Sequence, residues 1–165
     1  LFANSHFRPY YSDDLIGVEI GGAIKNVMAI ATGIADGLQF GANARAALIT
    51  RGLHEIMCLG LALGAKKDTF MGLSGLGDLT LTCTDDQSRN RRFGLALGKG
   101  LSVKDALKEV GQVVEGADNV KQVLQLASDH GLEMPISEHV DKVIDGKMTV
   151  QEAVTSLFSR ELKAE

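Results

Sequence analysis

Cysteine is scarce in this sequence, and no pattern of histidines compensates for it. The two cysteines, Cys58 and Cys83, are too few for the disulfide framework of a small secreted protein. The four histidines are scattered at positions 6, 54, 130 and 139, and no pair of Cys or His residues has the spacing of zinc ligands. We therefore expect a reduced, cytoplasmic protein that carries no metal.

Positive charge is not in excess either. The 17 Lys and Arg residues are outnumbered by 21 Asp and Glu residues, which gives a formal net charge of -4 and a pI near 5.6. This balance argues against a general binder of nucleic acid or anionic membranes, although it is compatible with a local basic cluster. The sequence shows neither a signal segment nor an apolar run of about 20 residues, so we expect no export and no membrane insertion. The expected partners are small molecules.

Length and hydropathy indicate one folded domain. With 165 residues, 45% of them hydrophobic, and a mean hydropathy of +0.07, the chain can bury roughly 70% of the surface that its unfolded form exposes. No internal repeat or low-complexity linker interrupts it. The sequence begins at Leu1 rather than at a methionine, and we expect it to be a piece of a longer protein.

Two long helices are predicted in the first part of the chain. Residues 12–14 supply an N-cap and first-turn carboxylates, and the apolar residues after them recur at helical spacing, which predicts a helix over 13–35. Gly37 and Gly41 interrupt the pattern. A second helix, rich in Ala, Leu, Ile and Met, is predicted over 44–63 with a stop at Gly64, and we expect it to be largely buried.

The rest of the chain repeats the helical pattern in shorter pieces. Helical stretches are predicted at 70–71, 93–97, 106–110 after a cap at Ser102, 115–130 before Gly131, 135–144, and from a cap at Thr149 through about residue 162. Residues 7–11 are aromatic, contain a proline and predict a short extended piece or edge strand. About seven or eight helices with almost no strand predict an all-α domain, a compact multi-helical bundle.

Lys25 is a charged residue within an otherwise apolar helical stretch, residues 21–26 with the sequence GGAIKN. In a helix, Gly21 and Gly22 lie one turn before Lys25 on the same face, which leaves a patch without side chains beside the ammonium. Each glycine costs a helix interior about 1 kcal/mol relative to alanine, so helix stability does not explain the pair. Either the glycines allow close helix packing while Lys25 reaches solvent, or the patch receives a ligand.

A glycine-rich segment, residues 72–78 with the sequence GLSGLGD, differs from a dinucleotide-binding loop. That fingerprint needs the order G-x-G-x-x-G directly after a strand. This segment has the order G-x-x-G-x-G after a helical stretch, and no βαβ unit follows. The glycines instead let the backbone approach a neighbouring helix or a ligand. Asp78, at the end of the segment, is either a helix or turn cap or a functional acid.

The sequence turns basic at a predicted helix start. Ser88 fits an N-cap, so that Arg89 and Asn90 would open the helix, with two further arginines behind them. Free backbone N–H groups, the positive end of the helix dipole and a guanidinium together suit a phosphate or a carboxylate. A solvated basic helix end is the other interpretation. A nucleic-acid patch is disfavoured, because no aromatic residue interleaves with the arginines and the net charge is negative.

Several ordered motifs extend over the whole chain. They occupy residues 16–19, 21–26, 40–45, 75–79, 82–84, 88–91 and 113–116. In these motifs the chain resembles the C-terminal domain of the soluble, bacterial-type NAD(P)-dependent glycerol-3-phosphate dehydrogenases. The resemblance implies the all-helical fold shared with the C-terminal domain of 6-phosphogluconate dehydrogenase. It also implies that the family's N-terminal Rossmann domain is absent, with residues 1–11 as its end or a linker and 12–165 as the helical substrate-binding and catalytic domain.

The resemblance implies an oxidoreductase that interconverts sn-glycerol 3-phosphate and dihydroxyacetone phosphate by hydride transfer with NAD or NADP. Lys25 matches the family's catalytic acid or base, and Asp78 would orient its ammonium. Positions that match substrate contacts in the family are Lys25, Asn26, Asp78, Thr82, Ser88, Arg89 and Asn90. Positions that match coenzyme contacts are Arg89, Val113 and Glu115, while the absent N-terminal domain would hold most of the coenzyme.

The implied enzyme would supply glycerol 3-phosphate for phospholipid synthesis in the cytoplasm, would form a homodimer, and would be inactive without its Rossmann domain. Its partners would be the small substrate and that domain, with no nucleic acid and no membrane. Two alternatives stay open, namely a related dehydrogenase domain acting on another 2-hydroxy acid and a helical interaction module without chemistry. An interaction module does not explain Lys25, Asp78 and Arg89 together. The basic helix start favours a phosphorylated substrate over another 2-hydroxy acid.

Overall fold

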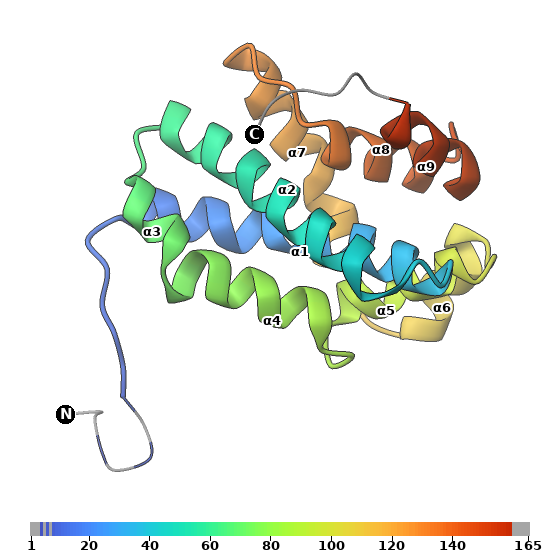
Figure 1. Ribbon diagram of the computed structural model, residues 1–165, viewed down its shortest axis with the longest axis horizontal. Helices are drawn as coiled ribbons and strands as arrows, with labels where there is room; N and C mark the ends of the chain where they lie inside the picture. The colour runs from blue at the N-terminus through green and yellow to red at the C-terminus, as the bar shows by residue number, and fades with distance from the viewer. Residues whose placement is uncertain (1–3, 5, 7, 160–165) are drawn as a thin grey trace.

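The computed structural model describes residues 4, 6 and 8–159, and all the regular structure within them is helical (Figure 1). In chain order the elements are α1 (Leu15–Gly37), α2 (Gly41–Ala62), α3 (Lys67–Met71), the π-helix η1 (Leu73–Gly77), α4 (Asp78–Thr84), α5 (Arg89–Gly98), α6 (Val103–Val110), α7 (Glu115–Asp129), α8 (Pro135–Ile144) and α9 (Val150–Phe158). The predicted all-α, multi-helical bundle is confirmed, with somewhat more helices than expected.

α1 is the central element, and most of the other helices pack against it. It runs through the middle of the domain in Figure 1, in contact with α2, α4, α5, α7 and α8. Its second half is almost entirely buried, and residues such as Ile24, Met28 and Ile30 form the centre of the hydrophobic core. Burying each such side chain contributes roughly 1.5–3 kcal/mol. The core thereby fixes the helix that carries Lys25.

α1 and α5 cross so closely that only glycine fits between their backbones. A Cβ atom added at Gly94 would lie 2.1 Å from the carbonyl oxygen of Ile30, and one added at Gly33 would lie 2.2 Å from that of Arg91. Backbone atoms cannot move aside as the end of a flexible side chain can, so any larger residue would push the two helices apart. This α1–α5 seam, formed by Gly33 and Gly94, holds the basic start of α5 beside α1.

By length and composition alone, α1 is long and apolar enough to cross a membrane. It has 23 residues with a hydropathy of 1.4, and 50% of its apolar window is buried inside the fold. The expectation of no apolar run of about 20 residues is corrected on this point. The position of α1 explains its composition, because a helix surrounded by other helices must be hydrophobic on most of its sides.

α2 is less buried than its composition predicted. Its buried residues are Gly52, Leu53, Glu55, Ile56, Leu59 and Gly60, which recur at helical spacing on one face. The first half of the helix, up to residue 51, is exposed or half-buried. The expectation of a largely buried helix is therefore wrong. An alanine-rich sequence does not distinguish a buried helix from a half-exposed one, because alanine is the best helix former at exposed and buried positions alike.

Several predicted helix starts are confirmed by the hydrogen bonds that cap them. Asp14 Oδ1 accepts a hydrogen bond from Gly17 N at 3.0 Å at the start of α1, and Ser102 Oγ accepts one from Asp105 N at 3.2 Å at the start of α6. Thr149 opens α9 with a reciprocal capping box. Local polar residues therefore decide where these helices begin.

Two expectations at the ends of the chain differ from the structure. Residues 8–11 form no strand and are exposed, because the described residues contain no sheet that an edge strand could join. Phe7, the first residue of that predicted piece, lies outside the described residues. α9 ends at Phe158 rather than near residue 162, and residues 160–162 also lie outside the described part of the chain.

Glu55 joins the buried face of α2 to the start of α8. It is 4% exposed, and its carboxylate accepts hydrogen bonds from Ile136 N at 2.6 Å, from Ser137 N at 3.2 Å and from Ser137 Oγ at 2.8 Å. The two backbone donors are free groups of the first turn of α8, so a side chain from another helix caps it. Burial raises the pKa of Glu55 to about 7, against the opposing effect of these hydrogen bonds.

We expect the free energy of unfolding to fall as the pH rises from about 4.5 to about 7, because the folded protein keeps the Glu55 proton in this range and the unfolded chain does not. The contribution is on the order of 3 kcal/mol. Urea unfolding between about pH 5 and about pH 8 measures it. Glu55→Gln should lose this pH dependence and Glu109→Gln, at an exposed position, should keep it. Equal slopes for the parent and Glu55→Gln would contradict the assignment.

Candidate active site

A pocket of about 560 Å³ opens between α1, the α4–α5 connection and the start of α7. In Figure 1, α4 and α5 follow one another, and α1 packs against both of them. Its lining residues are Gly22, Lys25, Asn26, Leu81, Thr82, Asp85, Gln87, Ser88, Arg89, Asn90 and Glu115. Its size falls within the range of small-molecule sites, and its charged and polar lining suits a polar ligand.

Lys25 and Asp78 form an ion pair at this pocket. Lys25 Nζ, from the middle of α1, donates to Asp78 Oδ2, at the first residue of α4. The side chain of Lys25 is 22% exposed, so its ammonium is held next to the carboxylate without being sealed from the pocket that it lines. An acid in the first turn of α4 is also favoured by the helix dipole. Asp78 itself is not among the lining residues and supports Lys25 from the side.

The π-helix η1 brings Asp78 to Lys25. A Cβ atom added at Gly75 would lie 2.2 Å from the carbonyl oxygen of Phe70, and one added at Gly21 would lie 3.0 Å from that of Ser74. Glycine at both positions therefore lets η1 fold tightly onto α3 and approach α1. This matches the close backbone approach expected for the glycine-rich segment 72–78. Single π-turns of this kind are frequent at functional sites.

Thr82 holds Asp78 from one turn further along α4. Its hydroxyl donates to the carbonyl oxygen of Asp78 at 2.6 Å and lies 3.3 Å from Asp78 Oδ1. The second carboxylate oxygen of Asp78 is thus left to Lys25. Thr82 also lines the pocket, so it belongs both to the support of the ion pair and to the surface that a ligand would meet.

Glu115 links two other walls of the pocket. Its Oε1 lies 3.2 Å from Arg89 Nη2, at the start of α5, and its Oε2 accepts a hydrogen bond from Asn26 Nδ2 of α1 at 3.2 Å. Asn26 Nδ2 also contacts the carbonyl oxygen of Gly22 at 3.3 Å. One carboxylate at the first residue of α7 therefore fixes the orientation of the guanidinium and of the amide.

The start of α5 has the cap that the sequence predicted. Ser88 Oγ accepts a hydrogen bond from Arg91 N at 3.3 Å, and Arg89 is the first helical residue. Asn90 is buried, and its Oδ1 accepts a hydrogen bond from Gly116 N at 2.8 Å. Asn90 therefore also ties the start of α5 to the start of α7, which positions Arg89 and Glu115 relative to each other.

Arg91 is a supporting residue that sequence reasoning did not single out. It is only 7% exposed, its Nη1 lies 2.5 Å from Asp36 Oδ2, and its Nε lies 2.9 Å from Asp86 Oδ1. Arg45 Nη1 also reaches Asp36 Oδ2 at 2.7 Å. These contacts join the end of α1, the start of α2 and the α4–α5 connection that lines the pocket. The basic run 89–92 carried no sign of which arginine would be buried.

The structure brings most of the predicted site residues together. Those lining one pocket are Lys25, Asn26, Thr82, Ser88, Arg89, Asn90 and Glu115, and Asp78 is paired with Lys25. Val113 is 62% exposed and is not part of the lining. Gly22, which the sequence placed in a patch that could receive a ligand, also lines the pocket. The lining residues Leu81, Asp85 and Gln87 were not singled out, although each lies within three positions of Thr82 or Ser88.

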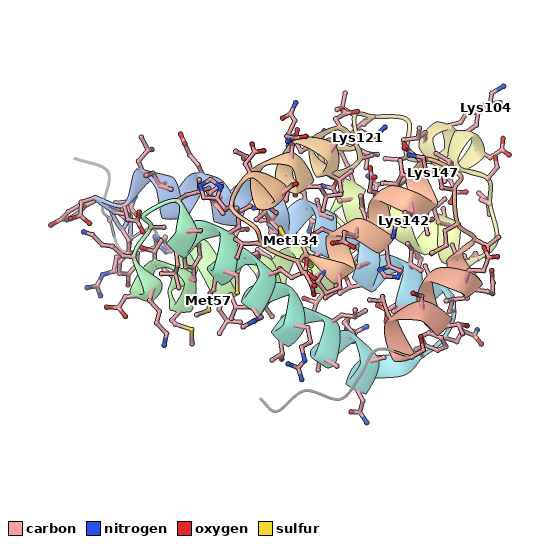
Figure 2. The ribbon with its side chains drawn as sticks, turned by 90° about the horizontal axis from the view of Figure 1, so that it is seen from above. Met57, Lys104, Lys121, Met134, Lys142 and Lys147 are labelled. Carbon is pink, nitrogen blue, oxygen red and sulfur yellow. The ribbon has the colours of Figure 1, made fainter. Side chains whose placement is uncertain are left out.

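A second basic cluster lies away from these residues. Figure 2 shows Lys121, Lys142 and Lys147 near one another on α7, α8 and the segment after α8. Lys121 Nζ and Lys147 Nζ each lie 2.8 Å from a carboxylate oxygen of Asp145, and their hydrogen bonds lower the pKa of Asp145. None of these lysines lines the pocket. Within the described residues, no group of three or more His, Cys, Asp or Glu side chains could hold a metal ion.

The described domain is all-helical, and one polar pocket is lined by a helix-start arginine and by a lysine that is paired with a carboxylate. The family model described as "NAD-dependent glycerol-3-phosphate dehydrogenase C-terminus" matches residues 14–155. The chain belongs to this family, and the resemblance seen in the sequence is confirmed.

Relatives and solved structures agree with this placement. The chain is 59% identical over its full length to glycerol-3-phosphate dehydrogenase [NAD(P)+] of Pseudoalteromonas translucida and 56% identical to that of Legionella pneumophila, and it covers 49% and 50% of those proteins. The crystal structure of glycerol-3-phosphate dehydrogenase from Coxiella burnetii matches with a TM-score of 0.92 and 53% identity, over 96% of this chain and 49% of that one. The chain thus spans about half the length of the curated relatives it matches.

Proposed function

We propose that this domain is the substrate-binding and catalytic part of an NAD(P)-dependent enzyme that interconverts sn-glycerol 3-phosphate and dihydroxyacetone phosphate. The observation that carries the proposal is the placement of Lys25, paired with Asp78, in the same pocket as Arg89 at the start of α5. A lysine can exchange a proton with a substrate oxygen, and an arginine at a helix start can bind a phosphate. A phosphorylated secondary alcohol needs both groups within one pocket.

Lys25 is the proton-transfer group in this proposal. Oxidation of the C2 hydroxyl requires a base that removes its proton, and reduction of the ketone requires an acid that delivers a proton to the C2 oxygen. The amine and ammonium forms of one lysine serve the two directions. Asp78 orients the ammonium, and Thr82 holds Asp78 in place. Asn26 lies next to Lys25 in the pocket wall and would contact the substrate.

Ser88, Arg89 and Asn90 bind the substrate phosphate in this proposal. They surround the first turn of α5, where free backbone N–H groups and the positive end of the helix dipole favour an anion. The planar guanidinium of Arg89 can form two parallel hydrogen bonds to phosphate oxygens. In the present structure one of its nitrogens contacts Glu115, so an incoming phosphate would share or replace that partner.

Arg89, Val113 and Glu115 would contact the coenzyme. When bound, NAD(P) supplies the hydride acceptor or donor of the reaction. The three residues fit this role because all are accessible at or beside the pocket: the side chains of Arg89 and Glu115 are 38% and 51% exposed, and Val113 precedes α7 on the surface. An N-terminal Rossmann domain would hold most of the coenzyme, with residues 1–11 as its end or a linker and 12–165 as the present domain.

The wider setting is also part of the proposal. The complete enzyme would work in the cytoplasm as a homodimer and supply glycerol 3-phosphate for phospholipid synthesis. Its test is an assay of the full-length protein with NADH and with NADPH, using dihydroxyacetone phosphate and, separately, unphosphorylated 2-keto acids. We expect turnover of the phosphorylated ketone. Preferential turnover of a 2-keto acid would replace this function with the related 2-hydroxy-acid dehydrogenase.

We expect the 165-residue chain by itself to be folded and helical but inactive. Its hydrophobic core is built from its own helices, whereas the pocket would provide only one side of the coenzyme cleft. Circular dichroism should give a helical spectrum with a cooperative thermal transition, and an assay with dihydroxyacetone phosphate should give no turnover. Measurable turnover by this chain alone would overturn the division of the enzyme into two domains.

A further inference from the structure

Gly22 differs from the other helical glycines of the described chain. It lies inside α1, where glycine costs about 1 kcal/mol relative to alanine. A Cβ atom added at Gly22 would meet nothing within 4 Å. Among the described residues, every other glycine that lies within a helix and has a negative φ has at least one atom within 4 Å of such a Cβ, and most have a backbone or side-chain clash. Packing therefore does not account for the glycine at this position.

The open space at Gly22 belongs to the pocket. Gly22 is one of the lining residues, and it lies one helical turn before Lys25 and Asn26, about 4.5–6 Å away along the helix axis. Its carbonyl oxygen accepts a hydrogen bond from the Asn26 amide. The missing side chain thus leaves room directly beside the proton-transfer lysine rather than on an unrelated surface.

Gly22 lies further along α1 from the α1–α5 seam than Lys25 and Asn26 do, because α5 meets α1 at Gly33. The route from Arg89 to Gly22 passes through two intervening side chains, since Arg89 contacts Glu115, Glu115 contacts Asn26, and Asn26 contacts the Gly22 carbonyl oxygen. Arg89 and Gly22 are therefore at opposite ends of one row of contacts.

From this arrangement we infer that Gly22 forms the floor of a subsite for the unphosphorylated end of the substrate, the C1 hydroxymethyl group. The inference rests on the proposed function. If the phosphate lies at Arg89 and the C2 oxygen at Lys25, then C1, bonded to C2 on the side opposite the phosphoester, points away from Arg89. A side chain at position 22 would fill the volume that C1 and its hydroxyl need. Gly22 is then a specificity-determining residue that selects three-carbon over two-carbon phosphates.

The test compares two substrates of the full-length enzyme that differ only at this end. Dihydroxyacetone phosphate has the hydroxymethyl group, and glycolaldehyde phosphate lacks it. Gly22→Ala should lower kcat/KM for dihydroxyacetone phosphate about tenfold, the effect of one misplaced methyl group in a fitted pocket. For glycolaldehyde phosphate, kcat/KM should change by less than about threefold. If its turnover is too slow to measure, its Ki as an inhibitor of dihydroxyacetone phosphate reduction should change by equally little. The melting temperature should rise, because alanine favours the helix and meets no neighbour.

Thr50→Ala is the matched control, because it also raises helix propensity but lies at an exposed position of α2 outside the pocket. It should leave both substrates unaffected. Equal losses for both substrates in Gly22→Ala, a loss seen only in the KM of the coenzyme, no loss at all, or a lower melting temperature would each overturn the inference. If the parent enzyme does not reduce dihydroxyacetone phosphate, the proposed function fails instead, and the two failures are distinguishable.

Discussion

Lys25→Met in the full-length enzyme should lower kcat by a factor on the order of 10² to 10⁴, the range for loss of a positioned acid or base. Methionine preserves the length and the apolar stem of the side chain, so the packing of α1 should persist while the group that exchanges the proton is lost. Coenzyme binding, measured by fluorescence titration, should survive. The effect should therefore appear in kcat much more than in the affinity for NAD(P).

Lys121→Met is the matched control for this substitution. Lys121 also pairs with a carboxylate, that of Asp145, but it lies outside the pocket. Its replacement should leave turnover close to that of the parent. If Lys25→Met also kept turnover within a few-fold of the parent over the working pH range, Lys25 would be a packing residue whose amine reaches solvent.

Replacing Arg89 with alanine should lower kcat/KM for glycerol 3-phosphate by one to two decades. The lost interactions are charge-assisted hydrogen bonds worth roughly 1.5–3 kcal/mol each. Glycerol has no phosphate, so it should already be a very poor substrate and should lose much less on the same substitution. The decisive quantity is the ratio of the two losses. Equal losses would mean that Arg89 does not bind the phosphate, and the assignment of the substrate would lose its main chemical support.

Two further variants sharpen this experiment. Arg89→Lys should fall between the parent and Arg89→Ala, because an ammonium restores the charge but not the planar two-point geometry. Arg92→Ala removes an exposed arginine from the same helix that does not line the pocket, and it should leave the phosphate preference unchanged. A rise in the coenzyme KM of Arg89→Ala does not decide the matter, because Arg89 is also expected to touch the coenzyme.

The local features of the fold could be predicted from the sequence because short-range rules control them. Apolar spacing identified α1, and capping residues such as Ser88, Ser102 and Thr149 marked the starts of α5, α6 and α9. The burial of α2 could not be predicted in this way. It depends on which helices pack against each face, and a sequence rich in alanine is compatible with either answer.

Some features of the candidate site could likewise be predicted from the sequence, and others could not. Lys25 stood out as a charge in an apolar helix, and the start of α5 as a basic run after a cap. The pairing of Lys25 with Asp78 joins residues 53 positions apart, and only the resemblance to a known family suggested it. The buried contacts of Arg91 were not foreseen, because four neighbouring basic or polar residues look alike until the neighbouring helices decide which of them is covered.

The seam between α1 and α5 limits how far apart two groups of a bound substrate can lie. Because backbone meets backbone at Gly33 and Gly94, no change of side chain elsewhere can bring these two helices closer, and any larger residue at the seam drives them apart. On the proposed roles, this fixes the separation between the group that handles the proton, on α1, and the group that anchors the phosphate, on α5. A substrate with a longer link between its hydroxyl and its phosphate would therefore not reach both groups correctly while the two seam glycines are in place.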